Sequence, residues 1–169
     1  MKNERTMSDS VGAPRFVRRG RMVLAGFRER FTEETMSGIP ALWGRFAPHI
    51  GRVRGEVAGV AYGVCVRPCE GEAGFDYMAA VEVAAGGADS GIFQRLEIPA
   101  LEYAVFVHPG HVSKLVETME GIQREWAPRL RRALKDDERE APAFFERYGP
   151  GFDPERGEGD MEVWVPVGR

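Results

Sequence analysis

Hydrophobic and polar residues alternate along several short stretches of the chain, as is typical of β-strands with one buried face. The pattern predicts strands at residues 16–27, 59–66, 75–83, 93–99, 101–108, 144–148 and 161–167. Turn residues between 67 and 74 join the second and third strands into a hairpin, and a glycine-rich connector at 85–91 divides the chain.

Two segments repeat their apolar residues at helical spacing instead. The first stripe consists of Ile39, Leu42, Trp43, Phe46 and Ile50, and the second of Val112, Leu115, Val116, Met119, Ile122 and Trp126. Pro40 suits the first turn of a helix, whereas Pro48 is expected to end or bend the first helix and Pro128 to interrupt the second.

Each half of the chain therefore contains a strand, a helix and two further strands. We predict an α+β fold in which duplicated βαββ units form a curved antiparallel sheet with two main helices on one face. Residues 1–14 are expected to be a disordered tail and residues 15–169 a single domain, with pseudo-repeats at about 15–84 and 93–168. The charged run 135–140 is predicted to be an exposed loop.

The composition narrows the class of protein. The 169 residues are 43% hydrophobic, which is enough for one core without staples. No apolar stretch reaches the ~20 residues of a membrane span, and no signal-like block begins the chain, so we expect a cytoplasmic protein without membrane contact.

Charge is distributed unevenly. Residues 1–30 carry eight Lys or Arg against three Asp or Glu, so the rest of the chain is acidic. An acidic domain argues against a nucleic-acid partner and favours cationic or neutral ligands. We interpret the basic residues Arg18, Arg19 and Arg21 as a solvated strand edge.

Residues that often bind metals are too few for a metal centre. Cys65 and Cys69 lack a second pair of ligands at zinc-site spacing. His108 and His111 could pair on a metal, but a strand-to-helix turn with one histidine near the helix cap explains them more simply. We expect neither a metal nor a cofactor.

Carboxylates placed between aromatic residues are the candidate chemistry. Alternation puts Phe144, Glu146 and Tyr148 on one face of a strand. If that face is solvated or Glu146 pairs with an arginine, the residue is only a polar strand position. If it lines a cavity, its carboxylate needs a cation or a hydrogen-bond donor to remain charged.

Two further strands carry similar combinations. Glu162 and Trp164 share one face of their strand, while Glu82 lies opposite Tyr77 and Val81 on its own. Together with Tyr62, Tyr103, Phe106 and Tyr148, these residues could form an aromatic pocket with acidic counter-charges, although each aromatic residue taken alone is more typical of a core.

An ordered series of short motifs resembles a known family. The series consists of Ile39-Pro40-Ala41-Leu42-Trp43, Ala61-Tyr62-Gly63-Val64, Phe75-Asp76-Tyr77 through Val81-Glu82-Val83, Ile98-Pro99-Ala100-Leu101-Glu102-Tyr103-Ala104-Val105-Phe106, Trp126, Phe145-Glu146-Arg147-Tyr148 and Met161-Glu162-Val163-Trp164-Val165-Pro166-Val167. Over roughly residues 15–168 it is similar to the GyrI-like small-molecule-binding family, which includes AraC-type effector-binding domains. The resemblance implies the same duplicated fold, with a ligand groove between the repeats.

The resemblance also implies roles for particular residues. Glu146 and Tyr148 match a motif whose glutamate meets lipophilic cations in multidrug-sensing relatives, and Glu162 and Glu82 match acidic positions of the family pattern. The expected ligand-binding set is Glu146, Tyr148, Glu82, Glu162, Trp164, Tyr62, Tyr77, Tyr103, Phe106 and Trp43.

Only about fourteen residues precede the matching region, whereas transcription-factor relatives carry a DNA-binding module there. We therefore expect a stand-alone protein that senses or sequesters lipophilic, cationic small molecules and does not contact nucleic acid directly. Two alternatives stay open: a glutamate-dependent hydrolase of reactive, cyclopropane-type xenobiotics, and an inhibitor that binds DNA gyrase. A homodimer also stays open. A binding protein is favoured over an enzyme, because the sequence contains no familiar catalytic set.

Overall fold

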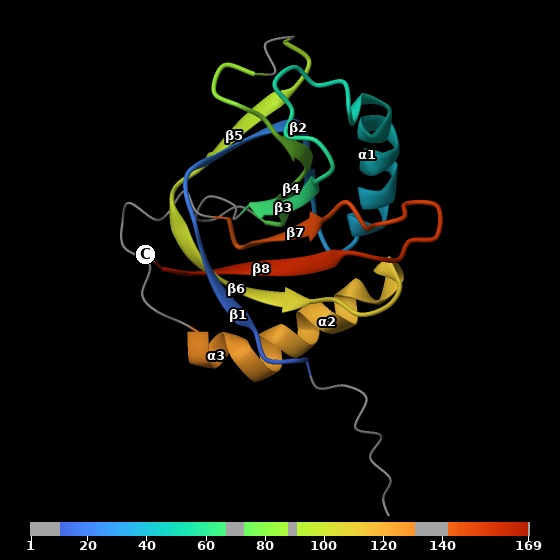
Figure 1. Cartoon of the computed structure of the whole chain (residues 1–169). Coiled ribbons are helices and arrows are strands. Elements are labelled where there is room, and N and C mark those ends of the chain that lie inside the picture. The colour runs from blue at the N-terminus through green and yellow to red at the C-terminus, as the bar shows by residue number, and fades with distance from the viewer. Residues whose placement is uncertain (1–10, 67–72, 88–90, 131–141, 169) are drawn as a thin grey trace, which may run out of the picture.

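The computed structural model describes residues 11–66, 73–87, 91–130 and 142–168 (Figure 1). Within these residues the strands are β1 (Arg15–Arg19), β2 (Met22–Phe31), β3 (Ala61–Val66), β4 (Phe75–Glu82), β5 (Gln94–Ile98), β6 (Leu101–Val107), β7 (Phe144–Tyr148) and β8 (Met161–Gly168). The main helices are α1 (Ile39–Phe46) and α2 (Leu115–Gly121), and α2 continues through a π-helical turn (Ile122–Trp126) into α3 (Ala127–Leu130). The predicted loop at 135–140, the expected tail up to residue 10 and Cys69 lie outside the described residues.

All the strands join one antiparallel sheet in the order β1-β6-β8-β7-β3-β4-β2-β5. The order is symmetric between the two halves of the chain. If β1, β2, β3 and β4 are taken to correspond to β5, β6, β7 and β8, replacing each strand by its counterpart gives the same order in reverse. The two halves therefore meet at the central pair, β3 and β7, which confirms the predicted duplicated α+β fold.

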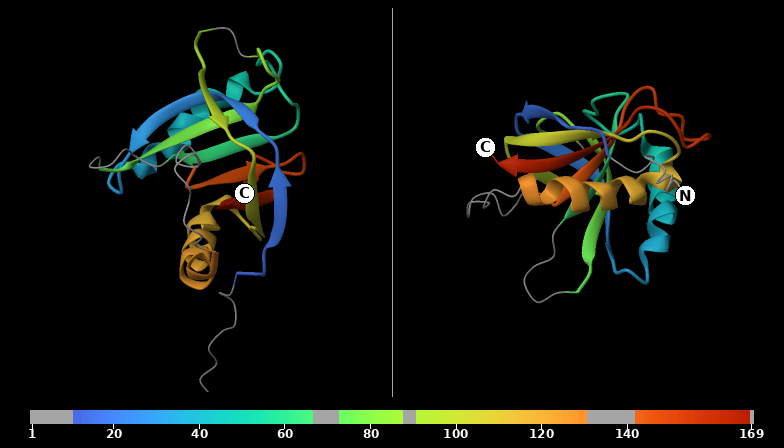
Figure 2. Two further views of the ribbon diagram at one scale, coloured as in Figure 1. Left: turned by 90° about the vertical axis from the view of Figure 1, so that its left-hand side faces the viewer. Right: turned by 90° about the horizontal axis from the view of Figure 1, so that it is seen from below.

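The first predicted strand is in fact two strands. Gly20 and Arg21 separate β1 from β2, because β1 pairs with β6 and β2 pairs with β5 at the opposite end of the sheet. Pro99 and Ala100 separate β5 from β6 in the same way. These two links make the sheet curve on itself without closing (Figures 1 and 2).

The two faces of the sheet have separate cores. Side chains from every strand meet on the inner face, including Tyr62, Tyr103, Phe145 and Trp164. On the other face, which we call the helix face, α1 packs on β2 and β4 through Leu42 and Phe46, and α2 packs on β6 and β8. Figure 2 shows α1 and α2 against different parts of the curved sheet.

The apolar stripes of both helices are narrower than predicted. Ile50 is 38% exposed, because the helical segment ends at His49 after Pro48 and the chain becomes extended. Val116 is 55% exposed, so the buried stripe of the second helix runs through Leu115, Met119 and Ile122.

Pro128 does not interrupt the second helix. Proline lacks the N–H that an α-helix needs at this position, and the residues just before it form a π-helical turn in which the Ala127 N–H donates to the Ile122 carbonyl. This change of spacing lets the helix continue into α3.

Candidate functional site

Glu146 lies on the helix face of β7, one of the two central strands, and is half-buried. Its Oε2 accepts hydrogen bonds from the Tyr77 hydroxyl at 2.8 Å and from the Tyr148 hydroxyl at 2.7 Å. Tyr77 comes from β4, which is separated from β7 by β3. Two tyrosines from the two halves of the chain therefore hold one carboxylate oxygen.

Aromatic rings surround this carboxylate. The Trp43 indole N–H, from α1, donates to the Tyr77 hydroxyl at 3.0 Å, and the Trp43 ring meets the Tyr148 ring edge-on with centroids 5.5 Å apart. Phe152, in the loop after β7, packs on Tyr148 at 4.9 Å. We call Glu146, Trp43, Tyr77, Tyr148 and Phe152 the Glu146 cluster.

Burial affects the ionisation of these groups. Removal from water raises the pKa of Glu146 above its ordinary value, and the hydrogen bonds from Tyr148 and Tyr77 offset part of that rise. Burial followed by the proximity of Glu146 raises the pKa of both tyrosines. Both hydroxyls therefore stay protonated near neutral pH and act as donors.

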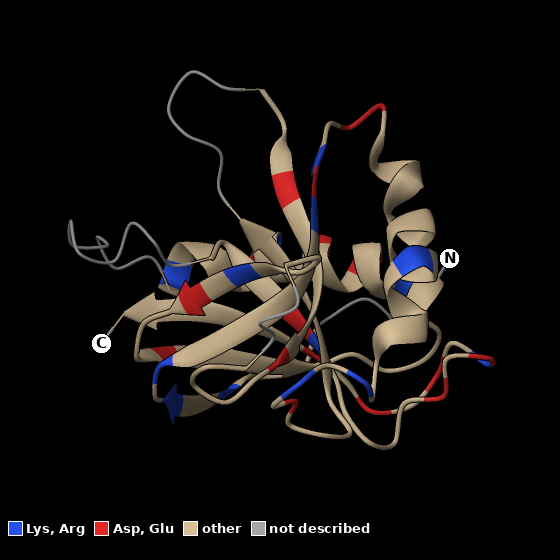
Figure 3. Ribbon diagram, turned by 90° about the horizontal axis from the view of Figure 1, so that it is seen from above, with Lys and Arg blue, Asp and Glu red and all other residues tan. Residues whose placement is uncertain are grey.

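Glu146 differs from the other acidic residues of the sheet in its charge environment. In the part of the chain that the structure describes, every other strand carboxylate has an arginine partner: Glu29 with Arg45, Asp76 with Arg28 and Arg30, Glu82 with Arg19, Glu97 with Arg21, Glu102 with Arg18, and Glu162 with Arg15 and Arg147. Figure 3 shows segments of both charges distributed over the strands. Glu146 has only its two tyrosines, so its negative charge is not balanced by a described cationic side chain.

Gly63 makes room for this arrangement. It lies in β3 directly between Ala79 of β4 and Glu146 of β7. A Cβ atom at this position would lie 2.1 Å from the Tyr77 hydroxyl oxygen and 2.6 Å from Glu146 Oε2. The Tyr77–Glu146 hydrogen bond therefore requires glycine at position 63.

We expect Gly63→Ala to separate Tyr77 from Glu146 and to destabilise the fold by about 1–3 kcal/mol, because the new methyl group overpacks the site. Urea denaturation measures the loss, and Gly44→Ala, where an added Cβ contacts nothing within 4 Å, is the control. A Gly63→Ala protein as stable as the Gly44→Ala protein would contradict this packing.

The structure brings only some of the predicted site residues together. Glu146, Tyr148, Tyr77 and Trp43 form one cluster on the helix face, whereas Tyr62, Tyr103 and Trp164 point to the inner core with Glu82 and Glu162. Phe106 is on the helix face but lies under the second helix, where it contacts Trp126. A single pocket containing all ten predicted residues is therefore not formed.

The inner-face carboxylates are already neutralised. Arg19 pairs with Glu82, and Tyr62 lies close to both, with its hydroxyl 3.4 Å from Arg19 Nη1. Glu162 is contacted by Arg15 at 2.5 Å, by Arg147 at 3.3 Å and by the Trp164 indole N–H at 3.3 Å. Among the described strand residues, Glu146 is the only carboxylate without an arginine partner. A mechanism that needs two unpaired carboxylates in one groove would therefore have one of them at most.

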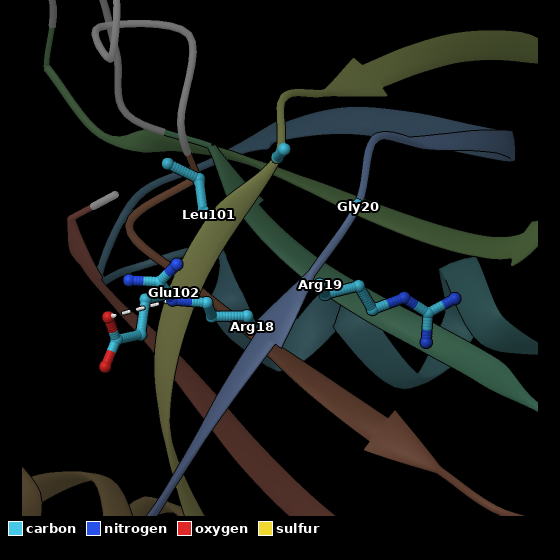
Figure 4. Close-up of a pocket in the computed structure, with 6 residues that line it drawn as sticks. Arg18, Arg19, Gly20, Leu101 and Glu102 are labelled. Atoms are coloured by element: carbon cyan, nitrogen blue, oxygen red, sulfur yellow. Dashed lines mark ion pairs between the residues drawn. The ribbon is translucent and has the colours of Figure 1, made fainter.

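A hollow of about 500 Å³ lies where the two strand links meet, lined by Arg18, Arg19, Gly20, Ala100, Leu101 and Glu102. In Figure 4 the Arg18 side chain is paired with Glu102 while Arg19 extends away from them. This hollow is separate from the Glu146 cluster, with which it shares no residue.

His108 and His111 hold the turn between β6 and the second helix. His108 is buried, with Nδ1 2.7 Å from the Thr118 hydroxyl and Nε2 2.8 Å from the His111 carbonyl. The His111 side chain accepts the Ser113 N–H at the start of the second helix, as the predicted cap requires. Across the described ranges we find no group of three or more potential metal ligands and no helix able to span a membrane.

Three contributions were not predicted from the sequence: Phe152 in the Glu146 cluster, Gly63 beside that cluster, and the arginine partners of Glu82 and Glu162. Gly63 did carry a signal, because an isolated glycine within a strand pattern indicates a close approach of neighbouring groups. The arginine pairs carried none, because they depend on strand pairing that alternation does not specify.

The fold and the cluster together are those of a small-molecule-binding domain: a duplicated antiparallel sheet carries an aromatic-flanked glutamate on its central strands. The chain belongs to the family of GyrI-like small molecule binding domains, which its residues 13–168 match.

Comparisons with individual proteins agree with this assignment. The transcriptional regulator BrlR of Pseudomonas aeruginosa is 30% identical over 135 residues, which cover 76% of this chain and 46% of BrlR. The chain thus spans about half the length of this relative.

Solved structures share the fold. SAV2435 bound to tetraphenylphosphonium superposes with a TM-score of 0.72 at 23% identity, covering 90% of this chain and 92% of SAV2435. A transcription regulation protein from Staphylococcus aureus MU50 gives a TM-score of 0.64 at 24% identity, with 92% and 98% covered. An integron cassette protein from Vibrio cholerae gives 0.62 at 14% identity, with 93% and 97% covered.

Proposed function

We propose that this protein binds lipophilic, cationic small molecules at the Glu146 cluster and acts as a sensor or a sequestering protein for them. The observation that carries this proposal is the half-buried carboxylate of Glu146, which has no arginine partner among the described residues. A partly desolvated charge without a counter-ion favours a cation from outside the chain.

The aromatic rings around Glu146 provide the contacts for the lipophilic part of the ligand. Trp43, Tyr148 and Phe152 offer apolar area and the negative faces of their rings, both of which attract a bulky organic cation. The tetraphenylphosphonium bound to SAV2435, a protein of the same fold, is a ligand of this class.

The direct test compares tetraphenylphosphonium with tetraphenylborate, an anion of the same shape, by isothermal titration calorimetry. A ligand of about 25 non-hydrogen atoms at ~0.3 kcal/mol each gives about 7.5 kcal/mol, so we expect a Kd in the low micromolar range for the cation. Tetraphenylborate should bind at least about tenfold more weakly. Equal binding of both ions would show that Glu146 does not select charge and would refute the proposal.

We also expect the affinity for the cation to depend on pH. Ionised Glu146 attracts the ligand and protonated Glu146 does not, so binding should weaken as the pH falls through the pKa of this residue. Because burial raises that pKa, the loss should begin at a higher pH than for an ordinary glutamate. Titrations from pH 8 to pH 5 measure it, and an affinity that stays constant over the range would contradict this dependence.

A further inference from the structure

The two oxygens of the Glu146 carboxylate have different environments. Oε2 accepts both tyrosine hydroxyls, whereas Oε1 accepts no hydrogen bond from any residue that the structure describes. Among the same residues, every fully buried side-chain polar atom has a hydrogen-bond partner. Since Oε1 has none, it is not fully buried and retains some accessible surface.

The hydrogen bonds of the cluster hold the carboxylate in this orientation. The Trp43 N–H donates to the Tyr77 oxygen, and the Tyr77 hydroxyl in turn donates to Oε2, where the Tyr148 hydroxyl also donates. Both hydroxyl hydrogens are therefore used on the same oxygen. Oε1 is left as an acceptor to which none of the described residues directs a donor.

We propose that Oε1 accepts a hydrogen bond from the cationic group of the ligand. The site therefore prefers N–H-bearing cations, such as protonated amines and amidinium groups, over quaternary cations that carry the same aromatic group. This inference rests on the proposed function and adds a chemical requirement to it: positive charge and apolar bulk alone do not give the tightest binding.

The preference for N–H-bearing cations follows from how closely the charge of each kind of cation can approach the Glu146 carboxylate. An N–H donor brings its charge to about 2.8 Å from a carboxylate oxygen, and charge-assisted hydrogen bonds are roughly twice as strong as neutral ones. The alkyl or aryl groups of a quaternary centre keep its charge farther away and leave Oε1 without a donor. The Coulomb attraction falls with that distance.

The test uses two naphthylmethyl ammonium ions that differ in one group. The N,N-dimethyl ion is protonated at pH 7.5 and has one N–H, while the N,N,N-trimethyl ion has none. In calorimetric titrations of the unmodified protein we expect the dimethyl ion to bind at least about tenfold more tightly, which corresponds to about 1.4 kcal/mol. In Glu146→Gln both ions should bind weakly and the ratio should fall below about twofold. Glu97→Gln, an exposed change on β5, should keep the wild-type ratio.

The outcomes separate this inference from the proposed function. If both ions bind equally and both lose affinity in Glu146→Gln, Glu146 is a charge site only and the inference is wrong while the proposed function stands. A tighter complex with the trimethyl ion also overturns the inference. If neither ion binds, or if Glu146→Gln binds both as tightly as the unmodified protein, the proposed function fails as well.

Discussion

Glu146→Gln is expected to weaken the binding of tetraphenylphosphonium roughly 30- to 150-fold. A cation about 6–8 Å from a carboxylate in surroundings with an effective dielectric constant near 20 gains about 2–3 kcal/mol, and this gain disappears when the carboxylate becomes an amide. The ring contacts with Trp43 and Tyr148 stay in place, so residual binding should keep only the smaller preference for cations that the ring faces provide, about 0.5–1 kcal/mol. Calorimetry with each ligand measures both effects.

The same substitution is expected to leave the unliganded protein as stable or to raise its Tm by about 2–4 °C. The folded protein raises the pKa of Glu146 above its unfolded value, so the stability associated with this group is present at low pH and is lost as the pH rises through the raised pKa. Above that raised pKa the ionised carboxylate therefore destabilises the fold, and a neutral glutamine removes that cost.

Glu97→Gln is the matched control, because it makes the same chemical change at an exposed strand position. It should alter neither the affinity nor the Tm measurably. A Glu146→Gln protein that loses stability together with affinity would show that the carboxylate is a structural residue and would contradict the proposed role.

The alternation of residues predicted which side chains share a face within each strand. It placed Tyr77 and Val81 opposite Glu82, and Trp164 with Glu162, and the structure has both arrangements. It also predicted the main strands and both helices, because burial of one face leaves a periodic signal in the sequence.

The sequence did not indicate which faces of different strands lie together. Alternation has the same appearance whichever way a strand is turned, and only the pairing of the strands decides whether Glu82 of β4 shares a face with Glu146 of β7 or lies on the opposite one. The predicted set therefore combined residues of both faces. Glu82 and Glu162 lie on the inner face beside arginines, while Glu146 lies alone among rings on the helix face.

The family resemblance and the structure agree on the fold. The resemblance could be recognised in the sequence because its motifs are spread over nearly the whole chain. The end of the first helical segment was predicted from Pro48, whereas the continuation of the second helix past Pro128 was not, because it depends on a local π-helical turn.

Phe145→Ala is expected to destabilise the protein by about 3–5 kcal/mol, as is typical when a large buried ring is removed. Phe145 is 1% exposed on the inner face. Its ring stacks on Trp164 at 5.4 Å and meets Tyr103 at 5.2 Å and Tyr62 at 5.5 Å. These partners come from β8, β6 and β3, so the ring joins the two halves of the chain where they meet.

Urea denaturation measures this loss, and Phe16→Ala is its control, because Phe16 is 57% exposed and its removal should change the stability by no more than about 0.5 kcal/mol. Phe145 and Glu146 are adjacent in the sequence but point to opposite faces of β7. The folded fraction of Phe145→Ala should therefore bind tetraphenylphosphonium with nearly the wild-type Kd, whereas Glu146→Gln should lose affinity without losing stability. If Phe145→Ala instead weakens binding as strongly as Glu146→Gln while still folded, the ligand enters the inner face, and the site must be sought among Tyr62, Tyr103 and Trp164.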